Sequence, residues 1–254
     1  MDQIGIDNII LLSAKKSKFS KNIIKYGIYS MMAGSFCSIG MAFAYSAGAG
    51  FYDSLGVSAL YKLAIGIAFA LSFTLIIFAG SELFTGNVLT MTIGSLTKEV
   101  SVFTAVKICT FCYTLNLIGA AIMGLIIAYS GALDGTSGHL ILEACSVKTT
   151  LPFIKAFLKG FMCNVMVCLG IWMVAKIKSE VAKMIALVWV IAGFVTPGYE
   201  HSIANGGLFA MTAVLSIEQI TISGVLANLI PVSLGNVFGG MFIAFVYWFA
   251  GKNE

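Results

Sequence analysis

Charged residues are scarce in this sequence, and arginine is absent. Asp, Glu, Lys and Arg make up 10% of the 254 residues, against about 25% in a typical soluble domain. Hydrophobic residues make up 59%, and the mean hydropathy is +0.98. The net charge of +4 comes from clustered lysines, which is typical of an orientation signal and not of nucleic-acid binding. The composition excludes an ordinary soluble domain and indicates a protein of the lipid bilayer with no nucleic-acid partner.

The sequence also lacks a disulfide framework and a metal-binding cluster. Of its six cysteines, all but Cys145 lie within apolar runs. The pair Cys109 and Cys112 has the spacing of a redox motif but lies in an apolar helix without the surrounding fold of a redox enzyme. Residues 1–25 hold five lysines and no long apolar core, so we expect no cleavable signal peptide. We also expect no cofactor, no metal and no catalytic residues.

Long runs without Asp, Glu or Lys mark the expected membrane spans, since about 20 apolar residues cross a bilayer as a helix. These runs are 26–52, 63–81, 108–133, 160–175, 184–199 and 219–251. The run 160–175 is short and must extend back to Leu151. Residues 63–97 and 184–215 continue in apolar residues past a polar break in the middle. The pattern predicts an all-α membrane protein with six spans, of which the second and the fifth are broken.

The lysines indicate orientation, because cytoplasmic segments of membrane proteins carry an excess of Lys. With the N-terminus inside, eleven of the 15 lysines fall on inside segments. The four outside are Lys62, Lys148, Lys155 and Lys159. We therefore expect a bacterial cytoplasmic (inner) membrane protein with both termini in the cytoplasm. Residues 1–25 are predicted to form a cytoplasmic amphipathic helix, either a membrane-surface anchor or a gate, and residues 26–254 the six-span domain.

Three pairs of motifs recur in the same order in the two halves of the chain. They are Gly34-x-x-Cys37 and Gly160-x-x-Cys163, Glu82-x4-Asn87 and Glu200-x4-Asn205, and Asn116-x-x-Gly119 and Asn236-x-x-Gly239. The offsets within these pairs are 126, 118 and 120 residues. A half with three spans has an odd number of crossings, so the halves, about 26–133 and 151–251, must have opposite orientations. Broken spans at matching positions of an inverted repeat point to the transport site.

The first break holds one carboxylate, Glu82, within an apolar span. A membrane-buried carboxylate needs hydrogen-bond donors, so Glu82 is interpreted as holding the loop together with Asn87, and the alternative is a proton relay. Thr85 offers a hydroxyl to a solute, and Leu83 and Phe84 can form an apolar gate. Gly86 is expected to permit the bend.

The second break begins at Pro197-Gly198, which ends a helix. Glu200 and Asn205 match Glu82 and Asn87 and are expected to hold this loop in the same way. His201 lies beside Glu200 at membrane depth, where ionisable groups are usually functional. We interpret His201 as a pore residue, with a hydrogen-bonded structural histidine as the alternative.

Three further polar residues each allow two interpretations. Asn164 and Asn236, in the fourth and sixth spans, either line the pore or bond across helices. Lys148, which precedes the fourth span, either attracts anions to the outer mouth or is a solvated loop charge.

At these motifs the sequence resembles the formate/nitrite transporter family over essentially its whole length. The matching stretches are residues 80–87 (GSELFTGN), 194–205 with the Glu-His pair, and 231–240 (PVSLGNVFGG). The resemblance implies an aquaporin-like fold, a homopentamer and one pore in each protomer. The chain is most similar to the hydrosulfide-channel branch, although none of these residues distinguishes hydrosulfide from formate or nitrite. The Asn-Pro-Ala signatures of aquaporins are absent from both breaks.

The resemblance also implies roles for individual residues. The pore histidine of the family falls on His201, its loop threonine on Thr85 and its outer lysine on Lys148. Its apolar constrictions fall on Leu83, Phe194 and Phe73, and its asparagines of the fourth and sixth spans on Asn164 and Asn236.

We therefore expect a channel or transporter for small monovalent anions of weak acids, hydrosulfide first, then formate or nitrite. In this hypothesis His201 lends a proton, so that a neutral acid crosses the apolar rings, because a bare charge is far more costly to bury. The alternative from another class is a neutral-solute pore for water, ammonia or glycerol. A third class is a membrane enzyme that uses Glu200 and His201. Against it, the sequence near this pair contains no nucleophile, metal cluster or cofactor motif.

Overall fold

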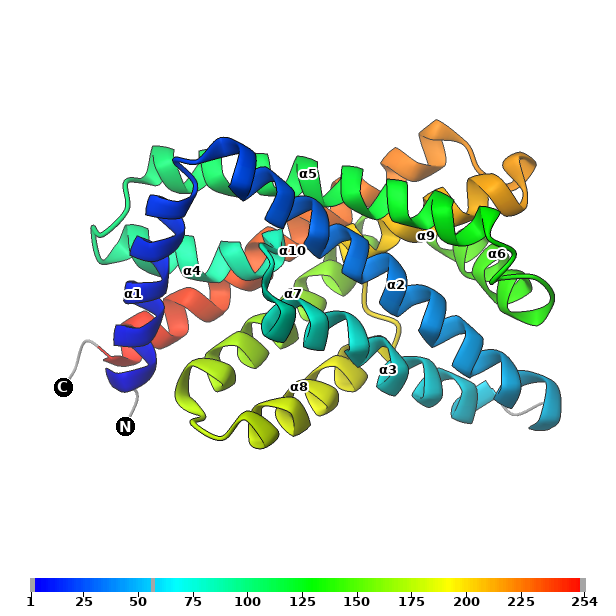
Figure 1. Ribbon diagram of the computed structural model, residues 1–254, viewed down its shortest axis with the longest axis horizontal. Coiled ribbons are helices and arrows are strands. Elements are labelled where there is room, and N and C mark those ends of the chain that lie inside the picture. The colour runs from blue at the N-terminus through cyan, green and yellow to red at the C-terminus, as the bar shows by residue number, and fades with distance from the viewer. Residues whose placement is uncertain (1–2, 56–57, 252–254) are drawn as a thin grey trace.

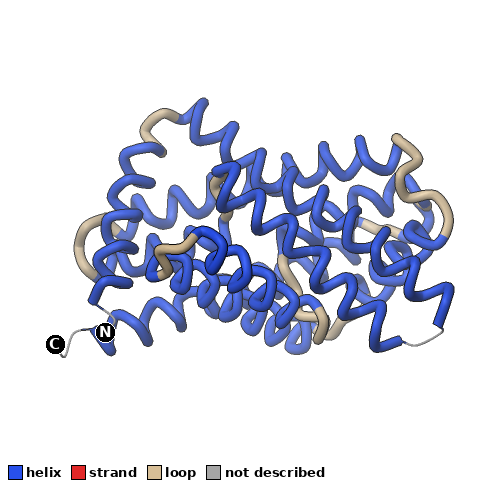
Figure 2. The backbone as a smooth tube through the Cα atoms, turned by 60° about the horizontal axis from the view of Figure 1, so that its bottom comes forward, coloured by secondary structure: helices blue, strands red, loops and turns tan. Residues whose placement is uncertain are grey.

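The computed structural model describes residues 3–55 and 58–251, and every regular element in this part of the chain is a helix (Figure 2). In chain order the elements are α1 (Gln3–Phe19), α2 (Ile23–Leu55), α3 (Ser58–Thr74), the π-helix η1 (Leu75–Gly80), α4 (Phe84–Leu96), α5 (Val102–Tyr129), α6 (Thr136–Thr149), α7 (Phe153–Lys176), α8 (Glu180–Val195), α9 (Ser202–Leu215), the short 3₁₀ helix η2 (Ile217–Gln219) and α10 (Ile222–Gly251). The all-α prediction is confirmed.

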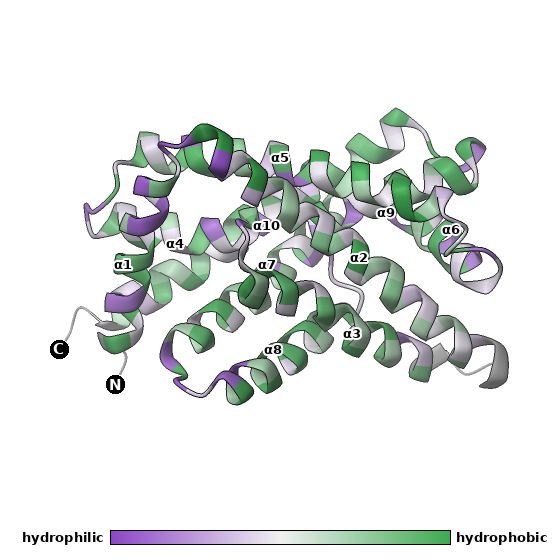
Figure 3. Cartoon of the chain, viewed as in Figure 1, coloured by the Kyte–Doolittle hydropathy of each residue, from purple (hydrophilic) through white to green (hydrophobic). Residues whose placement is uncertain are grey.

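The helices form an elongated bundle with α1 and α6 at its opposite ends (Figure 1). The start of α1 and the end of α10 lie at the same end of the bundle (Figure 1). Five helices among the described residues are long and apolar enough to cross a membrane. They are Ile23–Tyr52, Leu60–Gly80, Val102–Tyr129, Phe153–Lys176 and Ile222–Gly251. Apolar residues dominate these helices, whereas polar residues concentrate on α1 and at helix ends (Figure 3).

The N-terminal helix ends earlier than the sequence predicts. It stops at Phe19, and residues 23–25 already belong to α2. The reason is a helix cap, because the Asn22 side-chain oxygen accepts a hydrogen bond from the N–H of Lys25 at 3.1 Å. The apolar side of α1 packs into the bundle, where Ile6 and Ile9 are buried. Met1, Asp2 and residues 252–254, including Lys252, lie outside the described residues.

A helix was missed between the third and the fourth span. The segment with Lys148 that precedes the fourth span was not expected to be helical, but it forms α6 after a turn at Gly135, where φ is +78°. Its apolar side faces inward, with Leu140, Ile141 and Cys145 buried. The extension of the fourth span toward Leu151 is confirmed, since α7 begins at Phe153.

Two helix crossings depend on glycine, because the backbones approach too closely for any side chain. A Cβ on Gly119 of α5 would collide with the carbonyl oxygen of Met31 on α2. A Cβ on Gly239 of α10 would collide in the same way with the carbonyl oxygen of Phe161 on α7. Met31 and Phe161 are 130 residues apart. The glycine contacts thus match Met31 with Phe161, an offset of 130 residues between the two halves. The predicted match of Gly34 with Gly160 has an offset of 126 and differs from it by four residues, or about one helical turn.

Substitution of Gly119 by alanine should destabilise the fold. The added methyl group has the Met31 backbone against it and cannot be accommodated by a rotamer change. We expect a loss of roughly 1–3 kcal/mol or more, the usual cost of overpacking, measured as a lower unfolding temperature in detergent. Gly50→Ala is the matched control, because a Cβ there meets nothing within 4 Å. Equal unfolding temperatures for the two variants would contradict this account of the crossing.

Candidate functional site

Both predicted breaks are present, and each has a glycine in the left-handed region at its start. In the first, η1 ends at Gly80 (φ +82°) and α4 begins at Phe84. In the second, α8 ends at Val195, Gly198 has φ +78°, and α9 begins at Ser202. L-residues with side chains rarely adopt such angles.

The first break lies nearer the N-terminus than expected, since Thr85, Gly86 and Asn87 form the first turn of α4. Gly86 is therefore not the bend residue. It allows close packing instead, because a Cβ there would lie 2.6 Å from Cδ1 of Ile171.

A buried asparagine, Asn116, closes the hydrogen bonds of the first break. Its Oδ1 accepts from the N–H of Phe84 at 2.8 Å, which satisfies a free donor at the start of α4. Its Nδ2 donates to the carbonyl oxygens of Glu82 at 2.8 Å and Ser30 at 2.7 Å. The N–H of Glu82 donates to the carbonyl oxygen of Tyr29 at 3.1 Å. The broken backbone is thereby tied to α2 and α5.

Asn236 forms the equivalent set of hydrogen bonds at the second break. Its Oδ1 accepts from the N–H of Ser202 at 3.0 Å, and its Nδ2 donates to the carbonyl oxygens of Glu200 at 3.0 Å and Gly160 at 2.8 Å. The N–H of Glu200 donates to the carbonyl oxygen of Lys159 at 3.2 Å. These two sets of contacts, which we call the asparagine clamps, relate the two halves of the chain.

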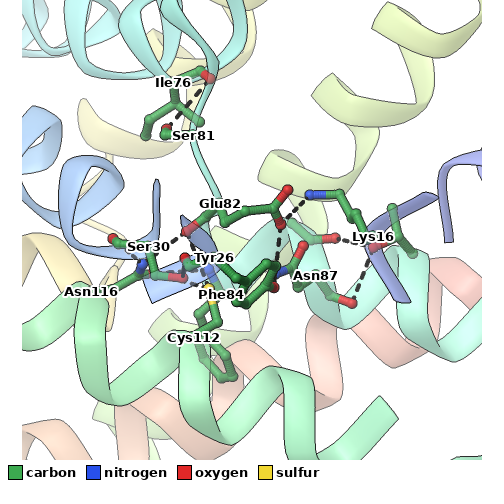
Figure 4. A network of polar contacts seen from close by, with 12 residues as sticks. Lys16, Tyr26, Ser30, Ile76, Ser81, Glu82, Phe84, Asn87, Cys112 and Asn116 are labelled. Atoms are coloured by element: carbon green, nitrogen blue, oxygen red, sulfur yellow. Dashed lines mark hydrogen bonds and ion pairs between the residues drawn. The ribbon is translucent and has the colours of Figure 1, made fainter. Parts of the chain in front are cut away.

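The Glu82 carboxylate is held by an ion pair with a residue of α1 (Figure 4). Lys16 Nζ lies 2.5 Å from Glu82 Oε2, and the Tyr26 hydroxyl lies 3.3 Å from the same oxygen. Asn87 Nδ2 donates in turn to the Tyr26 hydroxyl at 2.8 Å. These contacts are those of a residue that holds a loop, and they leave Glu82 tied to a fixed cation.

The Glu200 carboxylate is held in a matching way by a residue of α6. Lys148 Nζ lies 2.9 Å and 2.8 Å from the two carboxylate oxygens, and Asn205 Nδ2 donates to Oε2 at 2.6 Å. Asn205 also donates to Asn228 Oδ1 at 2.9 Å. The Glu200 side chain is only 4% exposed. Lys148 is therefore not a solvated loop charge, because it lies on a helix and both oxygens of a buried carboxylate contact its ammonium group.

A small chamber lies between the two breaks. Its volume is about 10 Å³, roughly the space of one water molecule. Phe73, Leu83, Phe194 and His201 all line it, so the three expected constriction residues and the expected pore histidine come together. Leu83 and His201 are the residues just before α4 and α9. Both broken helices therefore begin at the chamber.

Thr85 and His201 form the polar contact beside this chamber. Thr85 Oγ1 lies 3.1 Å from His201 Nε2, and both residues are buried. The other ring nitrogen, Nδ1, accepts from the N–H of Ala204 at 3.2 Å and so caps α9. An accepting nitrogen carries no proton, so the neutral ring holds its proton on Nε2 and donates to Thr85. The Thr85 hydroxyl oxygen then accepts, and this contact does not use the hydroxyl hydrogen.

A second cavity of about 350 Å³ adjoins the chamber and shares Phe69, Phe194 and His201 with it. The Phe69 and Phe194 rings meet edge to face with their centroids 6.3 Å apart. These two rings thus separate the large cavity, which we call the outer vestibule, from the chamber. Its charged lining residues are Lys62, Glu143, Lys148, Lys159 and Glu200.

Asn164 and Asn236 bond across helices and line neither cavity. Asn164 Nδ2 donates to the carbonyl oxygens of Asn236 at 2.5 Å and Thr85 at 3.3 Å. Among the described residues, no group of three His, Cys, Asp or Glu is arranged to hold a metal ion.

Sequence reasoning missed several residues of the site. Phe69 lies four positions before Phe73, and this helical spacing could have revealed it. Asn116 was noted as part of the repeat but not as a clamp. Lys16 and Asn228 gave no signal, because their partners are distant in the sequence.

Removal of a clamp should destabilise its break. Asn116→Ala leaves the buried N–H of Phe84 without its acceptor, at roughly 1–3 kcal/mol. It also removes one donor each from the carbonyl oxygens of Ser30, which lies inside α2, and Glu82, which keeps the Cys112 thiol at 3.1 Å. We expect a lower unfolding temperature and faster hydrogen exchange at Phe84. Thr114→Ala, on an exposed position of the same helix, is the control. An unchanged exchange rate at Phe84 would show that Asn116 does not hold the break.

Comparison with known proteins gives a consistent result. The family described as "Formate/nitrite transporter" matches residues 7–249. The nitrite transporter NirC of Escherichia coli (strain K12) is 33% identical over 234 residues, which cover 91% of this chain and 85% of NirC. The solved structure of an "FNT family ion channel" superposes with a TM-score of 0.89 at 31% identity and covers 97% of this chain and 98% of its own.

A second solved structure, titled "Pentameric formate channel with formate bound", has a TM-score of 0.78 at 27% identity and covers 91% of this chain and 98% of its own. These relatives are transporters and channels, not enzymes. With five apolar helices able to cross a bilayer and a match over nearly its whole length, this chain is a multi-pass membrane protein that belongs to the formate/nitrite transporter family.

Proposed function

We propose that this protein is a channel for small monovalent anions of weak acids, of which hydrosulfide is favoured, with formate and nitrite as further substrates. The observation that carries the proposal is the chamber, which Phe73, Leu83, Phe194 and His201 line and beside which His201 contacts Thr85. Because His201 donates to Thr85, the Thr85 hydroxyl hydrogen is the donor that this pair offers to a small acceptor that has shed its water. The relatives named for nitrite and formate support the same class of substrate.

The two helix starts at the chamber favour a negative charge. The first N–H groups of a helix have no partner within it, and the helix dipole places about half a positive charge at its N-terminus. α4 and α9 both begin beside the chamber, at Phe84 and Ser202. An anion is therefore stabilised there without a fixed cation in the chamber.

We propose that His201 acts as a neutral hydrogen-bond donor and not as the source of a lent proton. A neutral imidazole that gives up its Nε2 proton becomes an anion, so a proton loan requires the doubly protonated ring first. That ring would need a proton on Nδ1, where the N–H of Ala204 donates. Protonation would thus break the cap of α9. The proton that neutralises the passing anion would then come from water.

We further propose six membrane spans in two inverted repeats. α3, η1 and α4 form one broken span, and α8 and α9 form the other. The two matching asparagine clamps support this pairing. We propose that both termini face the cytoplasm, as the lysine distribution favours.

A homopentamer with one pore in each protomer is proposed by similarity to the pentameric formate channel. Large apolar side chains are exposed along α5 and α10, for example Phe103, Tyr129, Ile222 and Phe249. In a membrane protein such faces are covered by lipid or by neighbouring protomers.

The substrate class is tested by a competitive flux panel in proteoliposomes. We expect hydrosulfide, formate and nitrite to pass at least about tenfold faster than chloride, because only their conjugate acids form at accessible pH and cross apolar rings uncharged. Osmotic water flux measured on the same vesicles is the control. Rapid water flux with no anion flux would replace this proposal with a neutral-solute pore.

The role of His201 is tested by two substitutions with different consequences. Asn at position 201 can cap α9 and donate a hydrogen bond but cannot titrate, so His201→Asn should retain flux within about tenfold of the unmodified channel and keep its pH dependence. His201→Phe has no donor and should lose most of the flux. If His201→Asn abolishes the pH dependence instead, the proton loan is supported and the neutral-donor role is wrong.

A further inference from the structure

The outer vestibule contains five charged side chains, and their pairing leaves one cation in excess. Three are lysines and two are glutamates, so the formal net charge is +1. Lys148 and Glu200 form an ion pair with both carboxylate oxygens engaged. Lys62 on α3 and Glu143 on α6 are exposed and have opposite signs. Their charges cancel in sum, but no ion pair joins them in the described part of the chain. Lys62 and Lys159 are therefore the lysines of this cavity without a bound carboxylate, and of the two Lys159 is the half-buried one.

Lys159 differs from Lys148 in having no counter-ion. In the part of the chain that the structure describes, no carboxylate oxygen lies within 4.0 Å of its ammonium group. The residue is half-buried on α7 and lines the outer vestibule. Its Nζ lies 3.8 Å from the position that a Cβ on Gly198 would take, so it stands over the loop of the second break.

The backbone of Lys159 places this charge at the break. Its carbonyl oxygen accepts the N–H of Glu200, the residue before His201. At the equivalent place in the first half, the carbonyl oxygen of Tyr29 accepts the N–H of Glu82. The first break therefore has a neutral tyrosine where the second break has an unpaired lysine.

We propose that Lys159, and not Lys148, is the charge that collects anions in the outer vestibule. Lys148 is occupied by Glu200 and acts with it to hold the loop. The inference rests on the proposed anion channel and adds a residue to it. A single uncompensated cation in a cavity with low-dielectric walls raises the local anion concentration, and salt screens the effect.

The test is the salt dependence of anion flux in proteoliposomes. Lys159→Gln should lower the initial rate at subsaturating formate about threefold at low ionic strength, where the Debye length is about 30 Å at 0.01 M. At an ionic strength of about 1 M, where the length is about 3 Å, the variant should match the unmodified channel. Lys159→Arg keeps the charge and should behave as the unmodified channel.

The matched control is Lys155→Gln, one turn earlier on α7. Lys155 is exposed and does not line the vestibule, so its loss should leave the rate and its salt dependence unchanged. Unfolding temperatures of all variants show whether each is folded. Lys148→Gln should lower the unfolding temperature, because it leaves the buried Glu200 carboxylate without its cation.

The outcomes separate the two proposals. If the unmodified chain passes no anion, the proposed function fails and the role of Lys159 with it. If it passes formate and the initial rates of Lys159→Gln and Lys155→Gln are equal at low ionic strength, the role of Lys159 is wrong and the channel proposal stands. A threefold loss that persists unchanged at high salt would also overturn the electrostatic role, because a screened charge cannot produce it.

Discussion

The structure depends on one requirement, that no backbone N–H or C=O group remain unpaired where water is excluded. A helix that stops inside a membrane exposes several such groups, and each costs several kcal/mol in hydrocarbon. Asn116 and Asn236 meet this requirement, since each side chain accepts one N–H and donates to two carbonyl oxygens across three segments of chain. An amide suits this task because it carries both donors and acceptors without a charge. The position of the chamber follows from these two residues.

The asparagine clamps also matter for the electrostatics of the two helix starts. Because the asparagines satisfy one N–H at each start, the remaining dipole of α4 and α9 acts at the chamber without a fixed cation there. In the proposed channel, the apolar rings around His201 would admit only a species that needs little hydration. Attraction and exclusion are thus supplied by separate parts of the same breaks.

Much of this arrangement was predictable from the sequence, and the reasons for the misses are physical. The long charge-free runs and the polar breaks identified the helices and the positions of Glu82, Glu200 and His201, because charge is so costly in a bilayer that its placement is informative. α6 was missed because an outer segment of mixed polarity carries no clear periodic signal. The partners Lys16 and Lys148 were not predictable as counter-ions, because the Lys16–Glu82 and Lys148–Glu200 contacts join residues 66 and 52 positions apart.

The pairing of Glu82 with Lys16 makes the first break depend on α1, which is not one of the long apolar helices. Lys16 belongs to α1, whereas the corresponding Lys148 lies between two long helices of the bundle. A shortened gene product that begins at α2 would retain every long apolar helix but would lack the counter-ion of a carboxylate that is only 10% exposed. Expression vectors that trim or replace the first helix would therefore alter the first break itself, while the second break keeps its own cation.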